Sequence, residues 1–178
     1  MIVIVDFSIL YYRMMFGSKR AVIENSDYFA HLLMNGVFQN FKDFNIDKKN
    51  RLILAVDCKK GSNWRVKYYT ENSKDFPEYT TPVRHVYKGG RPKDQEIPWD
   101  KVYEILEDFL NVMVKYSDVQ VVQHPRAEAD DVIAVTTQRY QKTEEIVIVS
   151  SDSDFKQLLS KNVSLYDPIR KIMYKVKD

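Results

Sequence analysis

Two kinds of apolar pattern alternate along the chain. Short continuous apolar runs occupy residues 2–5 (IVIV), 52–56 (LILAV) and 146–149 (IVIV), and 119–122 (VQVV) is a further short segment that is apolar apart from Gln120. A run of this kind, bounded by polar residues, is typical of a strand buried on both faces of a parallel sheet. Longer segments with apolar residues at helical spacing lie at 26–44, 98–116 and 129–140. Strands and helices are therefore expected to alternate.

The order of these segments predicts the fold class. Two further short strands are predicted at 163–166 and 171–176, joined by an Asp167-Pro168 turn. Alternating strands and helices favour an α/β fold with a mainly parallel central sheet and helices on both faces. A length of 178 residues fits a single domain over 1–178 with a substantial core.

Acidic residues follow three of the predicted strands. Asp6 follows the first, Asp57 the second, and Asp152 and Asp154 follow the strand at 146–149. In open α/β sheets, ligands bind beyond the carboxyl ends of the strands, where these side chains would gather. A single aspartate at a strand end is usually a turn residue or a helix cap, but three of them favour a site.

A second acidic cluster begins the predicted helix at 129–140. Glu128, Asp130 and Asp131 lie there, and Glu128 and Asp131 are three positions apart, so both can face the same way. Acids at a helix start also complement the helix dipole, and capping is therefore an alternative explanation. The five carboxylates between residues 128 and 154, gathered at one end of the sheet, would repel each other unless a cation lay among them. Because oxygen ligands favour magnesium or manganese over zinc, the pattern predicts a site for Mg²⁺ or Mn²⁺.

The segment from Lys59 to Lys93 has a different character. It interleaves nine basic residues with six aromatic residues and shows no clear helical or strand period. Such a segment is often a solvated loop. Basic side chains neutralise phosphates and exposed aromatic rings stack on unpaired bases, so the interleaving favours a surface that binds single-stranded nucleic acid.

Composition narrows the classes of protein further. Basic residues (27) and acidic residues (25) nearly cancel, which allows an acidic pocket beside a basic surface. With one cysteine, Cys58, an internal disulfide is excluded and a reducing compartment fits. No apolar run is long enough to cross a membrane, and the chain contains no glycine-rich nucleotide-binding motif. A soluble, cytoplasmic, monomeric protein is expected.

Several motifs together resemble those of the 5′ nucleases. They are IVIVDFS at 2–8, LILAVD at 52–57, GSNWRVKYY at 61–69, YKGGR at 87–91, AEADD at 127–131 and SSDSDF at 150–155. This PIN-like family includes flap endonucleases, the 5′-exonuclease domain of bacterial DNA polymerase I and phage 5′ exonucleases. The resemblance covers nearly the whole chain and implies a 5′-nuclease resolvase-like domain with a basic arch insertion at 59–97.

The resemblance also implies roles for individual residues. Lys88 and Arg91 match the catalytic basic residues at the base of the arch. Arg65, Lys67 and Tyr87 match substrate-contacting positions. The positions that match carboxylates binding two Mg²⁺ ions, which Mn²⁺ can replace, are Asp6, Asp57, Glu128, Asp130, Asp131, Asp152 and Asp154. The implied reaction is cleavage near the 5′ ends of DNA or RNA–DNA duplexes, as in primer removal during replication, inside a bacterium or a phage-infected cell.

One part of the family pattern is missing from this sequence. Family members continue into a helix–three-turn–helix segment that grips duplex DNA and adds ligands for the second metal, whereas this sequence ends at Asp178. A second chain that supplies this segment is therefore one expectation. Two alternative functions remain open: a nucleic-acid-binding module that does not cut, and a small PIN-type ribonuclease. A Toprim-type domain fits less well, because it carries Glu where this chain has Asp6.

Overall fold

The computed structural model describes residues 1–18, 24–47, 49–59, 63–71 and 96–176. The strands are β1 (Ile2–Asp6), β2 (Arg51–Val56), β3 (Gln120–Gln123), β4 (Ile146–Val149), β5 (Val163–Asp167) and β6 (Ile172–Tyr174). The helices are α1 (Phe7–Gly17), α3 (Ser26–Asp43), α4 (Trp64–Glu71), α5 (Trp99–Tyr116), α6 (Ala129–Tyr140) and the 3₁₀ helix η3 (Ser153–Leu158).

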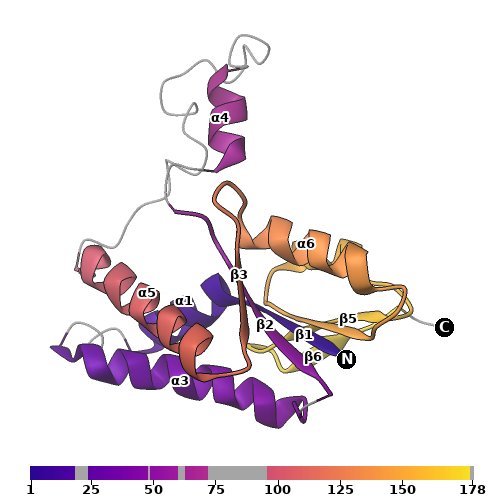
Figure 1. The fold of residues 1–178 in the computed structure, drawn as a ribbon, viewed down its shortest axis with the longest axis horizontal. Coiled ribbons are helices and arrows are strands. Elements are labelled where there is room, and N and C mark those ends of the chain that lie inside the picture. The colour runs from indigo at the N-terminus through magenta and orange to yellow at the C-terminus, as the bar shows by residue number, and fades with distance from the viewer. Residues whose placement is uncertain (19–23, 48, 60–62, 72–95, 177–178) are drawn as a thin grey trace.

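The strands form one sheet in the order β3-β2-β1-β4-β5-β6. β1 lies between β2 and β4 and is parallel to both, and β6 alone runs antiparallel, along β5. Figure 1 shows α1, α3 and α5 on one face of this sheet and α6 on the other. The predicted α/β fold with a mainly parallel sheet is confirmed.

Successive residues of the central strands enter opposite cores, because strand side chains alternate between the two faces of a sheet. Val3 and Val5 of β1 pack with the core beneath α1, α3 and α5. Ile2 and Ile4 pack with the core beneath α6. The apolar runs at 2–5 in β1, 52–56 in β2 and 146–149 in β4 thus have a physical reason, because both faces of these strands are covered.

The predicted boundaries agree closely with the structure in most elements. α6 spans 129–140 as predicted, and β4 spans 146–149. α3 begins after Asn25, whose side-chain oxygen accepts hydrogen bonds from the backbone N–H groups of Asp27 and Tyr28. Asn25 is therefore the N-cap of α3.

Two helices were not predicted from the sequence. α1 follows β1 directly, and its sequence FSILYYRMMFG is too uniformly apolar to show a helical period. α4 lies in the basic segment for which no period was found. Within α5, Val112 is 41% exposed although it is apolar, whereas its neighbour Met113 is buried.

Candidate active site

Three of the predicted site aspartates lie at the carboxyl ends of adjacent strands. Asp6 ends β1, Asp57 directly follows β2, and Asp152 follows β4 by three positions. Since β2, β1 and β4 are neighbours and parallel, these ends meet at the same edge of the sheet. The topology therefore brings together acids that are as much as 146 residues apart in the sequence.

Asp6 is the most buried of these acids, with 4% of its surface exposed. Its carboxylate accepts hydrogen bonds from the Ile9 backbone N–H at 3.3 Å and from the Ser150 hydroxyl at 3.1 Å. The pKa of Asp6 is raised to about 7, mainly by burial. The two hydrogen bonds act to lower this pKa, and the charges of Asp130 and Asp57 act to raise it. Asp57 and Asp130 are thus near enough for their charges to act on Asp6.

Asp57 connects β2 to the start of α6. One carboxylate oxygen accepts a hydrogen bond from the Ala129 backbone N–H at 2.8 Å, and the other accepts one from the Ser8 hydroxyl at 2.6 Å. The backbone carbonyl of Asp57 accepts a further bond from the Gln123 side chain at 2.7 Å. These contacts fix the start of α6, and with it Glu128 and Asp130, against the strand ends.

Asp131 is bound by Arg65 and Trp64, the first two residues of α4. The Arg65 guanidinium donates two hydrogen bonds to the two carboxylate oxygens, at 2.7 and 2.8 Å, and the Trp64 indole N–H donates one at 3.1 Å. The Glu128 backbone N–H donates a fourth, at 3.0 Å. Burial acts to raise the pKa of Asp131, but the Arg65 and Trp64 hydrogen bonds lower it below its ordinary value.

The Arg65 guanidinium also contacts Glu128, with 3.1 Å between Nη1 and Oε2. It lies over the Trp64 ring, 4.6 Å from the ring centroid. The backbone N–H of Trp64 donates to the Arg126 carbonyl at 2.8 Å. Arg65, predicted to contact substrate, and two predicted metal ligands therefore form one cluster that attaches α4 to the start of α6.

Asp152 and Asp154 lie at the 3₁₀ helix η3. Asp152 caps η3, since its side chain accepts a hydrogen bond from the Asp154 backbone N–H at 2.9 Å. The backbone N–H of Asp152 donates to the Ser150 hydroxyl oxygen at 3.1 Å, and that hydroxyl in turn donates to Asp6. Asp154 itself is exposed to solvent.

The donor set suits a hard cation. All seven predicted metal ligands offer carboxylate oxygens, which favour Mg²⁺ or Mn²⁺. Across residues 1–18, 24–47, 49–59, 63–71 and 96–176, however, no three His, Cys, Asp or Glu side chains converge closely enough to hold a metal ion as they stand. The hydrogen bonds described above draw several of these carboxylates toward protein donors. The carboxylates of Asp6, Asp57 and Asp152 at the strand ends, beside the acidic start of α6, would supply oxygen ligands for such a cation.

Other predicted residues lie on α4 or outside the described residues. Lys67 is on α4, two positions after Arg65, and is exposed. Lys88, Arg91 and Tyr87 lie outside the described residues.

Two serines that position the acids were not among the site residues predicted from the sequence. Ser8 and Ser150 each donate a hydroxyl hydrogen bond to a strand-end aspartate, and Ser150 is fully buried. Each serine lies within two positions of a predicted metal ligand in the sequence, at Asp6 and Asp152 respectively. Trp64 as a donor to Asp131 had no such signal.

No described helix is both long and apolar enough to cross a membrane.

The chain resembles a curated phage protein. It is 29% identical over 152 residues to "Ribonuclease H" of Enterobacteria phage T4. The aligned region covers 83% of this chain and 45% of that protein. The chain thus spans about half the length of this relative.

Solved structures of bacteriophage T5 proteins share the fold of this chain. The T5 D15 protein co-crystallised with metal ions superposes with a TM-score of 0.64 at 15% identity, over 98% of this chain and 56% of that one. The T5 D15 flap endonuclease in a complex with DNA and metal ions gives a TM-score of 0.63 at 14% identity, over 98% and 57%. A family model described as the 5′-3′ exonuclease N-terminal resolvase-like domain matches residues 1–178. The chain therefore belongs to the 5′-3′ exonuclease family, as its N-terminal resolvase-like domain.

Proposed function

We propose that this chain forms the catalytic part of a divalent-metal-dependent 5′ nuclease that hydrolyses phosphodiester bonds near the 5′ ends of DNA or RNA–DNA duplexes. The observation that carries the proposal is the convergence of Asp6, Asp57 and Asp152 at one edge of the sheet, beside the acidic start of α6. Family membership supports the reaction class. The T5 complex with DNA and metal ions supports a nucleic-acid substrate and a metal cofactor.

The carboxylates fall into two groups by their contacts. Asp6, Asp57, Asp130 and Asp152, with Glu128 beside them, would hold Mg²⁺ or Mn²⁺. Such ions supply an activated water and offset the negative charge that builds on the scissile phosphate. Asp131 already accepts four hydrogen bonds from protein groups, so it would orient the other carboxylates. Asp154 is exposed and would lie on the solvent side of the site.

The residues of the basic segment would hold the substrate. Arg65 and Lys67 lie on α4, which is attached to the acidic cluster by the Arg65–Asp131 pair, so a phosphate bound along α4 would pass close to the carboxylates. Lys88 and Arg91 would offset charge on the scissile phosphate, and Tyr87 would stack on a base.

Cleavage of a 5′-labelled flap duplex with and without Mg²⁺ tests the proposal, with a bare single strand as a second substrate. We expect Mg²⁺-dependent release of short 5′ products, and we expect Asp152→Asn to reduce the rate by at least about 100-fold, the scale of losing one catalytic group. The matched control is Asp118→Asn, which removes an exposed carboxylate from the loop before β3 and should cleave normally.

Two results would contradict this function. Full activity in Asp152→Asn would contradict the assignment of Asp152 as a ligand of the catalytic metal. A substrate that binds but stays intact with both Mg²⁺ and Mn²⁺ would favour the nucleic-acid-binding module. Arg65 gives that alternative a structural basis, because its guanidinium already neutralises Glu128 and Asp131.

A further inference from the structure

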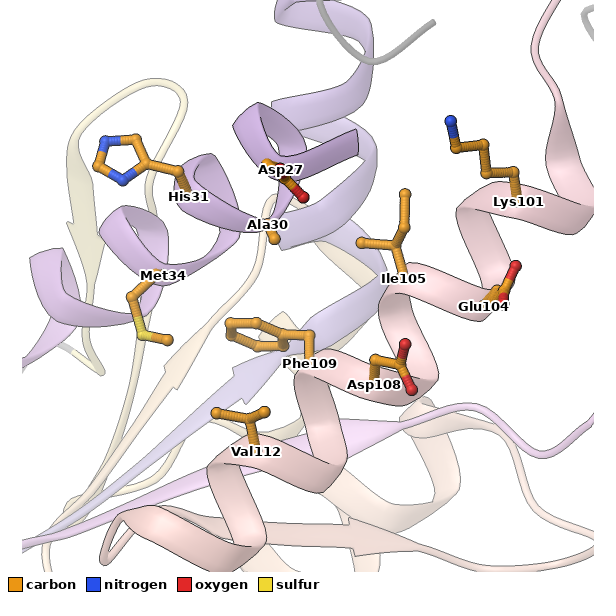
Figure 2. Close-up of a pocket in the computed structure, with 10 residues that line it drawn as sticks. All are labelled: Asp27, Ala30, His31, Met34, Lys101, Glu104, Ile105, Asp108, Phe109 and Val112. Carbon is orange, nitrogen blue, oxygen red and sulfur yellow. The ribbon is translucent and has the colours of Figure 1, made fainter. Parts of the chain in front are cut away.

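A groove separates α3 and α5 on the face of the sheet that they cover (Figure 2). It has a volume of about 660 Å³, within the range of clefts that bind small molecules. Figure 2 shows Ile105 and Phe109 of α5 directed toward α3, with Met34 on the opposite wall. None of the residues that line this groove belongs to the acidic cluster at the strand ends.

The apolar surface of the groove continues along both helices. Val112 lines the groove and is 41% exposed, and Tyr116, one helical turn later, is 71% exposed. On α3, Phe38 lies one turn after Met34 and is 55% exposed. An exposed apolar stripe that extends from a groove is typical of a surface that binds another protein.

The rim of the groove is acidic. Asp27, Glu104 and Asp108 line it against a single lysine, Lys101, although the chain as a whole carries a net charge of +2. In the part of the chain that the structure describes, the side chains of these three acids make no hydrogen bond or ion pair. Their charges are therefore available to a partner. A nucleic acid would be repelled here, so the occupant is not the proposed substrate.

We propose that the α3–α5 groove is a docking site for a cationic amphipathic helix of a partner protein. Its apolar face would cover the groove and the stripe formed by Val112 and Phe38, and its lysine or arginine residues would pair with Glu104 and Asp108. Each wall is an 18-residue helix, which is about 27 Å long and matches a partner helix of several turns. This interface is separate from the nuclease site and does not depend on it.

Binding of two synthetic helical peptides of about 15 residues tests the proposal. Both carry the same leucine face, but one has lysines on its polar face and the other has glutamates. Fluorescence anisotropy of the labelled peptides against the whole chain should show the lysine peptide binding at least tenfold more tightly at low salt. That preference should weaken as salt rises.

Two variants locate the binding. Glu104→Lys with Asp108→Lys should weaken the lysine peptide at least tenfold and strengthen the glutamate peptide. The control is Asp118→Lys with Glu145→Lys, which changes the net charge equally at exposed positions outside the groove and should bind like the native chain. Phe38→Ser with Val112→Ser should also weaken the lysine peptide at least tenfold, because it removes exposed apolar area without opening the core.

Three outcomes would overturn the proposal. Equal binding of the two peptides would remove the charge argument. Loss of affinity in the control pair as large as in Glu104→Lys with Asp108→Lys would mean that adsorption follows net charge and ignores the groove. Sedimentation that shows a dimer of the chain, lost in Phe38→Ser with Val112→Ser, would make a second copy the occupant. Nuclease activity should be unchanged in all these variants, so failure here is distinguishable from failure of the proposed reaction.

Discussion

The attachment of α4 to α6 by Arg65 and Asp131 can be measured as a coupling energy. The two side chains are 23% exposed each, and they share two hydrogen bonds at 2.7 and 2.8 Å. Hydrogen bonds to charged groups contribute about 1.5–3 kcal/mol when desolvated, whereas exposed ion pairs contribute about 0.2–1 kcal/mol. A partly exposed, bidentate pair lies between these limits, so we expect a coupling of ~1–2 kcal/mol.

The perturbation is a double-mutant cycle of Arg65→Met and Asp131→Asn. Arg65→Met also removes the ion pair between Arg65 and Glu128, whose side chain is 10% exposed, so it should be the more harmful single change. Because α4 extends away from the sheet (Figure 1) and this cluster attaches its start to α6, loss of the pair should release α4 and leave the sheet folded. A coupling of about 1.4 kcal/mol corresponds to a tenfold change in the population of detached α4.

Trp64 reports this release directly, since its indole N–H donates to Asp131. In a Trp99→Phe background, Arg65→Met should red-shift Trp64 emission and lower its anisotropy, and hydrogen exchange of the α4 amides should quicken about tenfold. Arg65→Lys keeps the charge but loses the bidentate geometry, and it should fall between native and Arg65→Met. A coupling below about 0.3 kcal/mol, or unchanged exchange in α4, would refute this account.

Three other predictions concern stability. Ser150→Ala removes a buried donor from Asp6 and should lower the free energy of unfolding by about 1–3 kcal/mol in urea titrations; a neutral effect would contradict the role of Ser150. Burial opposes ionisation of Asp167, but hydrogen bonds from neighbouring backbone N–H groups and a serine hydroxyl lower the pKa of Asp167 below 3.8, its ordinary value. The Asp167 carboxylate therefore stabilises the folded protein above the unfolded-state pKa, and this stabilisation is lost as pH falls through the folded-state pKa. Asp167→Asn should therefore be less stable than native at neutral pH and should lose less on acidification, and parallel pH curves for the two proteins would argue against this. A Cβ on Gly36 would lie 2.8 Å from the end of the Met14 side chain, so Gly36→Leu should push α1 and α3 apart and cost about 1–3 kcal/mol, visible as a lower Tm; an unchanged Tm would mean that this contact is loose.

The sequence was sufficient for the sheet because each central strand is covered on both faces. Residues 2–5, 52–56 and 146–149 are apolar without interruption, and that pattern identifies buried parallel strands. α1 escaped prediction because it is apolar on nearly all sides, lying between the sheet and α3. Periodicity reveals a helix only when one side faces water.

The acids of the candidate site could be predicted, but their partners could not. Asp6, Asp57 and Asp152 are marked by their positions after apolar strands, and parallel pairing then brings them together. The Arg65–Asp131 pair joins residues 66 positions apart on two helices, and neither spacing nor composition encodes that contact. The pair depends on the hydrogen bond from the Trp64 backbone N–H to the Arg126 carbonyl, which holds the start of α4 near α6 in the folded chain.

The central position of β1 governs how the protein folds as it is synthesised. β1 can pair with β2 early, but its other neighbour, β4, begins only at Ile146. At ribosomal rates, the roughly 90 residues between β2 and β4 take about 5–20 s to make. During that time the growing sheet has an open, apolar edge along β1, which is a template for mispairing with another nascent chain. Ser150 and Asp152 emerge only after β4, so the candidate site cannot assemble before that edge is closed.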